Sequence, residues 1–364
     1  MVVYKKEKET LKMRVEDVDK NLKVDKSIDK TGLNFYYFED TPFKVYGKLE
    51  RGEDGRLYRV PRDVAERTNS GVLTLCTNTA GGRVVFRTDS RRVAIIAKYG
   101  EAVYHGSHFP LTGSVGLDLY EGRKFLGGFV PPYDMPNKAY ESVIAIPGER
   151  AERELTINLP LYSDLTELYI GLDEDATLSE ASSYKYEKPV VYYGSSITQG
   201  GCASRPGSAY QAHLTRWLDT DHINLGFSGS AKGEDSIVDY MASLDMSVFV
   251  SDYDHNAPTV EHLDKTHLPL YRKIRAAHPD IPIIFLTRPN GILTEERLKR
   301  KAVIKKTYDT ALSDGDKNVY FLDMAEAMPF EGDEGTVEGC HPTDLGFYFM
   351  AKALYPILKE ALEK

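Results

Sequence analysis

Residues 189–201 have the sequence PVVYYGSSITQGG, and the rest of the chain is organised around them. The β-branched and aromatic run at 190–193 is typical of a short buried strand, which ends abruptly at Gly194. Small and hydroxyl residues follow and lead to an amphipathic helical pattern at 208–218. An open α/β sheet carries its chemistry where the carboxyl end of a strand turns into the next element. We therefore predict that Ser196 is a nucleophile.

The same Gly-Ser-Ser sequence is also ordinary turn and helix-capping chemistry, so the prediction depends on partners elsewhere in the chain. A serine hydroxyl needs a neutral imidazole to take its proton, and that imidazole needs an acceptor to fix its tautomer. Among the nine histidines, His341 has the most suggestive setting, in GTVEGCHPTDLGF at 335–347. Pro342 restricts His341 to extended backbone just before a predicted helix. Glu338, three residues upstream, can curl back to the other imidazole nitrogen.

Acyl transfer also needs hydrogen-bond donors for the oxyanion of the tetrahedral intermediate. The segment NLGFSGS at 224–230 follows a second predicted strand, and Gly229 allows a backbone N–H to approach closely. The segment DYDHNAP at 252–258 follows a third and presents the side-chain amide of Asn256. Each loop taken alone is more typical of an ordinary turn than of an oxyanion hole. Together with Ser196 they form a candidate oxyanion hole.

The length of 364 residues predicts about two domains, and 41% hydrophobic with 28% charged residues describe an ordinary globular protein. From residue 35 to about 172 the chain consists of short alternating or β-branched runs between turn signals. This pattern predicts a β-sandwich or jelly roll. The predicted strands are 72–77, 83–88, 92–98, 115–120, 125–130, 142–146, 154–159 and 165–170.

Beyond a polar stretch at 173–188, which we interpret as a linker, predicted strands and helices alternate. Such alternation predicts a parallel sheet covered by helices on both faces. The strands are 190–193, 222–225, 247–250, 281–286 and 319–322, and the helices 210–218, 236–242, 260–277, 295–313 and 345–362. The predicted organisation is an N-terminal extension at 1–34, a β-sandwich domain at 35–175 and an α/β domain at 188–364.

The charge pattern argues against nucleic acid or a membrane as a partner. The net charge is −9, from 46 basic and 55 acidic residues, and the basic run RLKRKAVIKK at 297–306 is typical of a solvated helix face. No apolar run approaches the roughly 20 residues that span a bilayer, and the N-terminus is charged where a signal peptide would be apolar. We therefore expect a cytoplasmic protein.

Cysteine usage indicates neither a disulfide framework nor a metal site. Cys76, Cys202 and Cys340 are odd in number and widely spaced, with no CxxC pair. We expect them to be small packing residues, although Cys202 and Cys340 lie close in sequence to the candidate site. No metal and no organic cofactor is predicted.

Four motifs occur in order over residues 189–364: Gly-x-Ser-Ile-Thr, Asn-x-Gly-x-Ser-Gly, an Asn after the third strand, and carboxylate-x-x-His-Pro-Thr-Asp-x-Gly. Together they resemble the SGNH, or GDSL, hydrolases. The resemblance implies a flavodoxin-like three-layer α/β/α fold, with Ser196 as nucleophile and His341 as base. The Ser196 and Gly229 N–H groups and the Asn256 side chain would form the oxyanion hole.

The chain departs from the family pattern at two positions. Ser195 stands where the family usually has Asp, so the nucleophile is assigned to Ser196 by the alignment of the motif. Glu338 stands where an Asp is usual and is one methylene longer. We predict that Glu338 orients His341, with a backbone carbonyl as the alternative.

The N-terminal half contains VGLDLY at 115–120, which resembles the Gly-x-Asp-Leu-Tyr signature of a β-sandwich domain found before one branch of these esterases. A loop of this half, HGSHFP at 105–110, could in principle complete the pocket. We expect instead that His105 and His108 are surface loop residues.

The resemblance implies hydrolysis of an ester through an acyl-Ser196 intermediate. Members with a β-sandwich domain often remove acetyl groups from carbohydrates, so the expected substrate is a small-molecule or oligosaccharide ester. Two alternatives remain open at this point: an acyltransferase that uses the same acyl-enzyme, and a non-catalytic carbohydrate-binding protein. The sequence predicts no oligomeric state.

Overall fold

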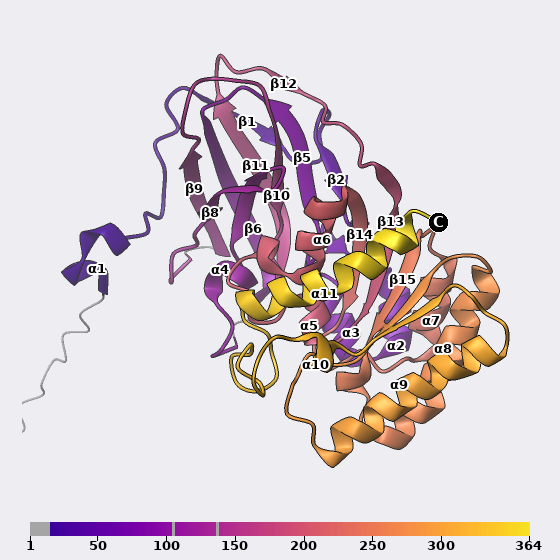
Figure 1. Ribbon diagram of the computed structural model, residues 1–364. Helices are drawn as coiled ribbons and strands as arrows, with labels where there is room; N and C mark the ends of the chain where they lie inside the picture. The colour runs from indigo at the N-terminus through magenta and orange to yellow at the C-terminus, as the bar shows by residue number, and fades with distance from the viewer. Residues whose placement is uncertain (1–14, 104–105, 136–137) are drawn as a thin grey trace, which may run out of the picture.

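The computed structural model describes residues 15–103, 106–135 and 138–364, and Figure 1 shows an antiparallel β-sandwich beside a helix-covered parallel sheet. Both sheets of the sandwich are antiparallel throughout. The first has the order β1 (Leu33–Tyr37), β11 (Ser163–Asp173), β6 (Arg92–Val103) and β9 (Ala139–Ala145). The second has the order β12 (Leu178–Ser179), β5 (Arg83–Thr88), β10 (Arg153–Asn158), β7 (Leu117–Glu121) and β8 (Lys124–Phe129), with β2 (Lys44–Tyr46) also paired to β5.

The sandwich encloses an apolar core because inward-facing side chains recur along its strands. On β10, Leu155 and Ile157 are fully buried and pair across the sheet with Phe86 and Val84 of β5. Side chains of the other sheet, such as Ile95 of β6, join the same cluster. The predicted all-β sandwich is therefore confirmed.

The second sheet consists of five parallel strands in the order β14, β13, β15, β16, β17. Counted along the chain this is the order 2-1-3-4-5 of a flavodoxin-like fold, as predicted. The chain changes direction beside β13, which therefore lies at the topological switch point. The strand bounds are β13 (Tyr186–Gly194), β14 (Thr220–Gly226), β15 (Val248–Asp252), β16 (Ile283–Leu286) and β17 (Val319–Leu322).

Helices cover both faces of this sheet, which explains why its central strand is apolar without alternation. Val190 and Tyr192 of β13 face a cluster with α6 (Tyr210–Leu218) and α11 (Asp344–Leu362). Val191 and Tyr193 face the opposite cluster, to which α2 (Arg62–Thr68) and α3 (Ser70–Leu75) contribute together with three longer helices. The longer helices are α7 (Asp235–Ser243), α8 (Val260–Ala277) and α9 (Glu295–Ser313).

The strand predicted at 72–77 is wrong, because α3, the second of two successive helices, covers residues 70–75. The two helices are α2 (Arg62–Thr68) and α3 (Ser70–Leu75), and the Asn69 side chain caps α3 by accepting the Val72 N–H at 2.9 Å. Val64 and Val72 pack into the core beneath the parallel sheet. A short apolar run does not distinguish a strand from a helix, and here the cap and the contact with the other domain favour the helix.

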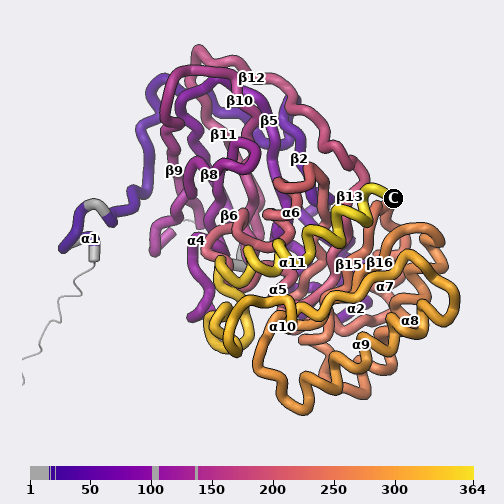
Figure 2. The backbone as a smooth tube through the Cα atoms, in the orientation of Figure 1, coloured from indigo at the N-terminus to yellow at the C-terminus, as the bar shows by residue number. Residues whose placement is uncertain are grey.

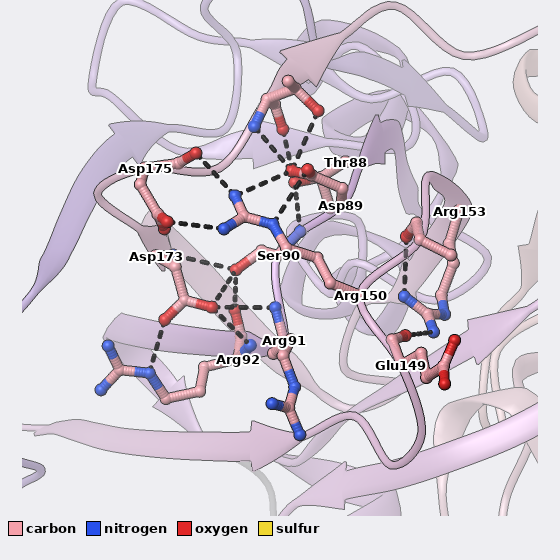
Figure 3. Close-up of polar contacts among 12 residues, drawn as sticks. Thr88, Asp89, Ser90, Arg91, Arg92, Glu149, Arg150, Arg153, Asp173 and Asp175 are labelled. Atoms are coloured by element: carbon pink, nitrogen blue, oxygen red, sulfur yellow. Dashed lines mark hydrogen bonds and ion pairs between the residues drawn. The ribbon is translucent and has the colours of Figure 1, made fainter.

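The stretch 173–188 is not a free linker. Asp173 accepts the backbone N–H groups of Arg91 and Arg92 and pairs with the Arg92 guanidinium, which fastens the start of this stretch to the sandwich (Figure 3). A little further on, β12 pairs with β5, and from Tyr186 the chain already belongs to β13. The sequence did not indicate this pairing, because β12 is an edge strand of only two residues within a polar stretch.

The remaining elements are short. In Figure 2 the tube of α1, which falls in the predicted extension 1–34, stands apart from the body of the protein. Within the described residues no helix is both long and apolar enough to cross a membrane. The short elements are α1 (Val15–Val18), η1 (Lys20–Leu22), β3 (Glu50–Arg51), β4 (Leu57–Tyr58), α4 (Leu111–Ser114), α5 (Ser196–Gln199), η3 (Pro206–Ser208), η4 (Asp254–Asn256) and α10 (Met324–Ala327).

The Gly-x-Asp-Leu-Tyr sequence lies at the contact between the sandwich and the parallel sheet. Asp118 is fully buried and accepts hydrogen bonds from the Asn158 side chain and the Gly207 N–H, both at 2.7 Å. The Tyr120 ring lies 4.0 Å from the Arg216 guanidinium on α6. The signature thus joins the two parts of the chain through a buried carboxylate and a cation–π contact.

Candidate active site

Ser196 opens a one-turn helix, α5, directly after the carboxyl end of β13. Ser195 caps this turn by accepting the Ile197 N–H at 3.1 Å, and Gly200 ends it in the left-handed conformation at φ +104°. At Gly194 any β-carbon would lie about 2 Å from Thr198 Oγ1 and the Asp252 carbonyl oxygen. Only glycine permits this abrupt turn, which leaves the Ser196 side chain at the sheet edge.

The structure brings Ser196, His341 and Glu338 into one hydrogen-bonded chain. His341 Nε2 lies 2.8 Å from Ser196 Oγ, and His341 Nδ1 lies 2.6 Å from Glu338 Oε1. The same carboxylate oxygen accepts the His341 backbone N–H at 3.0 Å. Because a carboxylate can only accept, Nδ1 carries the imidazole proton and Nε2 is free to accept the serine hydroxyl. The extra methylene of Glu338 does not prevent its contact with His341.

The loop that carries His341 is held in a tight arch. Thr336 and Pro342 form a β-bridge, and the Val337 N–H donates to the His341 carbonyl at 2.8 Å. Thr343 then caps α11 by accepting the Gly346 N–H at 3.2 Å. The imidazole is thus fixed by the backbone on both sides as well as by Glu338.

The candidate oxyanion loops lie next to the serine turn. The Phe227 N–H donates to the Gly194 carbonyl at 2.9 Å, and the Asn256 amide donates to the Phe227 carbonyl at 2.8 Å. Gly229 follows in the left-handed conformation at φ +66°, with open space where a β-carbon would be. Both loops therefore meet beside Ser196, and the second N–H of the Asn256 amide is available for a substrate.

Several buried polar side chains hold the loops of the site together. The sequence analysis did not single them out. The Gln199 side chain donates to Asn78 Oδ1 at 3.1 Å and accepts the Ser228 N–H at 3.0 Å, which joins the serine turn to the oxyanion loop. Asp252 accepts Thr198 Oγ1–H at 2.9 Å and the Tyr210 hydroxyl at 3.2 Å. Burial raises the pKa of the Asp252 carboxyl to about 8. For Asp252, the last residue of β15, the position at a strand end was the signal in the sequence.

The β-sandwich domain, which we call the antiparallel part, lines one side of the site with the rings of His108 and Phe109 and, behind them, Tyr162. We call these three side chains the wall of rings. The rings of His108 and Phe109 lie with their centroids 5.3 and 5.5 Å from that of His341. Phe109 packs on Tyr162 at 4.8 Å, and the Tyr162 hydroxyl donates to the Ser196 carbonyl at 3.1 Å. His108 is exposed, as expected, yet it borders the site rather than lying on a distant surface. His105 falls outside the described residues.

Two family models match successive parts of the chain. The model described as the GDSL-like lipase/acylhydrolase family matches residues 187–359, and the model described as the N-terminus of Esterase_SGNH_hydro-type, GxDLY, matches residues 33–178. Together they span residues 33–359 with only 179–186 between them. No curated protein sequence matches the chain.

Solved structures share the whole architecture. A protein from Bacteroides ovatus ATCC 8483 described as a GDSL-like lipase is 28% identical, with a TM-score of 0.81 over 91% of this chain and 98% of that one. A salicylyl-acyltransferase from a tetracycline biosynthetic pathway is 19% identical, with a TM-score of 0.71 over 89% of this chain and 96% of that one.

A family two carbohydrate esterase from Clostridium thermocellum, in complex with cellohexaose, is 14% identical, with a TM-score of 0.60 over 88% of this chain and 99% of that one. At that identity the similarity concerns the fold. The two family models and the common architecture agree with each other: the chain belongs to the SGNH, or GDSL, hydrolases, in the branch with an N-terminal Gly-x-Asp-Leu-Tyr domain.

Proposed function

We propose that the protein is a serine esterase that acts through an acyl-Ser196 intermediate and removes O-acetyl groups from a carbohydrate. The observation that carries the proposal is the hydrogen-bonded chain from Ser196 Oγ through His341 to Glu338, with contacts of 2.8 and 2.6 Å. Serine in contact with a neutral imidazole, itself oriented by a carboxylate, is the arrangement that activates a hydroxyl for acyl transfer.

In the first half-reaction His341 Nε2 takes the hydroxyl proton while Ser196 Oγ attacks the ester carbonyl carbon. The oxyanion that forms receives hydrogen bonds from the N–H groups of Ser196 and Gly229 and from the Asn256 amide. His341 then gives its proton to the leaving alcohol oxygen as the C–O bond breaks. Water repeats these steps on the acyl-enzyme, which releases the acid and restores the serine.

The wall of rings supports a carbohydrate as the alcohol half of the ester. Phe109 presents a flat apolar ring and His108 a flat polar ring beside His341, and the buried Tyr162 packs behind Phe109. Such faces suit the C–H surfaces of a sugar ring, and a ring with a polar edge can hydrogen-bond hydroxyl groups as well. The carbohydrate esterase among the structural neighbours is consistent with this choice.

A screen of acetylated oligosaccharides, read by mass spectrometry as loss of acetyl groups, tests the proposal. We expect acetyl loss with the wild type and none with Ser196→Ala. Turnover of long-chain esters without release of acetyl groups from any sugar would contradict the carbohydrate assignment. A folded wild type that cleaves neither these substrates nor 4-nitrophenyl acetate would contradict the esterase and favour a carbohydrate-binding protein.

An acyltransferase is the second candidate, because one of the structural neighbours, a salicylyl-acyltransferase, has the same two-part architecture. The acyl-enzyme would then be attacked by a sugar or another alcohol in place of water. Product analysis with a candidate acceptor present separates the two reactions. Hydrolysis predicts free acetate in proportion to substrate loss, whereas transfer predicts a newly acetylated acceptor.

A further inference from the structure

Four side chains that bind metals converge at the active site: His108, Cys202, Glu338 and His341. One donor atom of each lies within 4.8 Å of the donor atoms of the other three. They come from a loop of the antiparallel part, the loop after α5 and the loop before α11, so the fold alone brings them together. Two nitrogens, one sulfur and one carboxylate oxygen form a ligand set typical of four-coordinate Zn²⁺.

We propose that these four residues bind Zn²⁺ and that the bound ion reversibly inhibits the enzyme. The inhibition rests on the proposed function, whereas the binding does not. Neither His108 nor Cys202 has a part in the acyl-transfer steps described above.

The backbone holds Cys202 in place before any metal arrives. Its φ of +71° lies in the left-handed region, which is unfavourable for a non-glycine residue and persists only where the surroundings impose it. The preceding Gly201 packs so tightly that a β-carbon there would lie 3.0 Å from His341 Cδ2. The thiol of the next residue is thus fixed beside the imidazole by the chain itself.

The charges of the site match a divalent cation. The site holds one carboxylate, that of Glu338, and one thiol, that of Cys202, whose sulfur carries a proton that metal binding can release. A coordinated divalent ion displaces that proton to solvent, since a thiol bound to such an ion is deprotonated outright. The thiolate and the Glu338 carboxylate then together neutralise the two positive charges of Zn²⁺.

Coordination of His341 stops acyl transfer whichever nitrogen binds the ion. Binding through Nε2 takes the lone pair that accepts the Ser196 proton. Binding through Nδ1 displaces Glu338 from its hydrogen bond and leaves the proton of the neutral imidazole on Nε2, which then cannot accept another. Mg²⁺ should not bind, because it prefers oxygen ligands in octahedral geometry and the site offers one carboxylate.

The inhibition is tested by following 4-nitrophenyl acetate hydrolysis at buffered free Zn²⁺ concentrations, with each variant normalised to its own metal-free rate. We expect the inhibition constant to rise at least about tenfold in Cys202→Ser and in His108→Asn. Cys340→Ser is the matched control, because its thiol lies 3.9 Å from His255 Nδ1 and outside the four-residue group. Wild-type inhibition that is absent, or equal in Cys202→Ser, would overturn the proposal, as would a shift confined to Cys340→Ser.

Binding is measured apart from catalysis with Co²⁺ and the Ser196→Ala protein, which retains all four ligands. We expect a thiolate-to-cobalt charge-transfer band in the near ultraviolet, and its loss in the Ser196→Ala/Cys202→Ser double variant. The same band in both proteins, or in neither, would overturn the site. A band that depends on Cys202 in a protein whose wild type hydrolyses no ester would support the site and refute the proposed function.

Discussion

The α/β domain (the parallel part) and the β-sandwich domain (the antiparallel part) contribute different kinds of side chain to one site. Every group proposed to take part in the reaction lies in the parallel part outside its strands: Ser196 on α5, Asn256 on η4, and Gly229, Glu338 and His341 on loops. The antiparallel part instead contributes rings and a hydroxyl that border these groups. The carboxyl ends of parallel strands converge at one sheet edge, whereas the sandwich has its strand faces occupied by its own core. The comparison suggests that one part carries the chemistry and the other selects the substrate.

The largest expected effect comes from the reacting groups. Ser196→Ala and His341→Ala should each lower kcat by roughly 10⁴-fold or more, because the members of such a set act as a unit. Initial rates with 4-nitrophenyl acetate measure the loss, and unchanged thermal unfolding is the control for folding. A variant that retained a tenth of the activity would break the assignment of the chemistry to the parallel part.

Glu338→Ala should have a smaller effect, about 10³-fold in kcat, since the imidazole remains while its orientation and tautomer are no longer fixed. Glu338→Gln is the matched comparison, because its amide keeps the size of the side chain without the charge. Rates equal to wild type in both variants would show that another group, such as a backbone carbonyl, orients His341.

Asn256→Ala should lower kcat by about 10²- to 10³-fold with little change in KM, because its amide is proposed to bind the oxyanion rather than the ground state. Asn256 also donates to the Phe227 carbonyl, so the thermal stability of the variant must be measured in parallel. A rise in KM without a fall in kcat would move Asn256 from the chemistry to substrate binding.

Phe109→Ala tests the other side of the comparison. With a sugar ester we expect a rise in KM of about tenfold, the scale of a lost apolar contact in a binding pocket, while kcat on a small aryl ester changes little. Tyr133→Ala is the matched control, an exposed aromatic residue of the same part that should leave both substrates unaffected. Equal losses on both substrates would show that the rings serve the chemistry and not selection.

The last prediction concerns stability and not the rate of reaction. The pKa of Asp252 is about 8 in the folded protein and close to 4 in the unfolded chain, so the folded state binds the additional proton. The free energy of unfolding should therefore fall as pH rises through this window, by about 1.4 kcal/mol per pH unit, and level off above pH 8. Urea unfolding of wild type and Asp252→Asn at several pH values measures this, because the amide cannot ionise. A difference between the two that is independent of pH would refute a neutral Asp252.

The helices and strands of the parallel part could be predicted because each one is indicated by a pattern within its own residues. The periodicity of 260–277 and 295–313 matches α8 and α9 at both ends, and the β-branched runs mark the strands. The helix α3 and the pairing of β12 with β5 could not be predicted, since both depend on contacts with segments distant in the sequence. Likewise Ser196 and His341 stand in recognisable motifs, whereas His108 and Tyr162 reach the site only through tertiary packing.

The proposal that Ser196 forms the acyl-enzyme is tested most directly by a fluorophosphonate probe, which reacts covalently with an activated serine. After labelling, peptide mapping by mass spectrometry locates the adduct. We predict one adduct, on Ser196, formed in step with loss of esterase activity and absent from the folded Ser196→Ala protein. An active protein that is not labelled, or that loses activity through an adduct on another residue, would contradict the account.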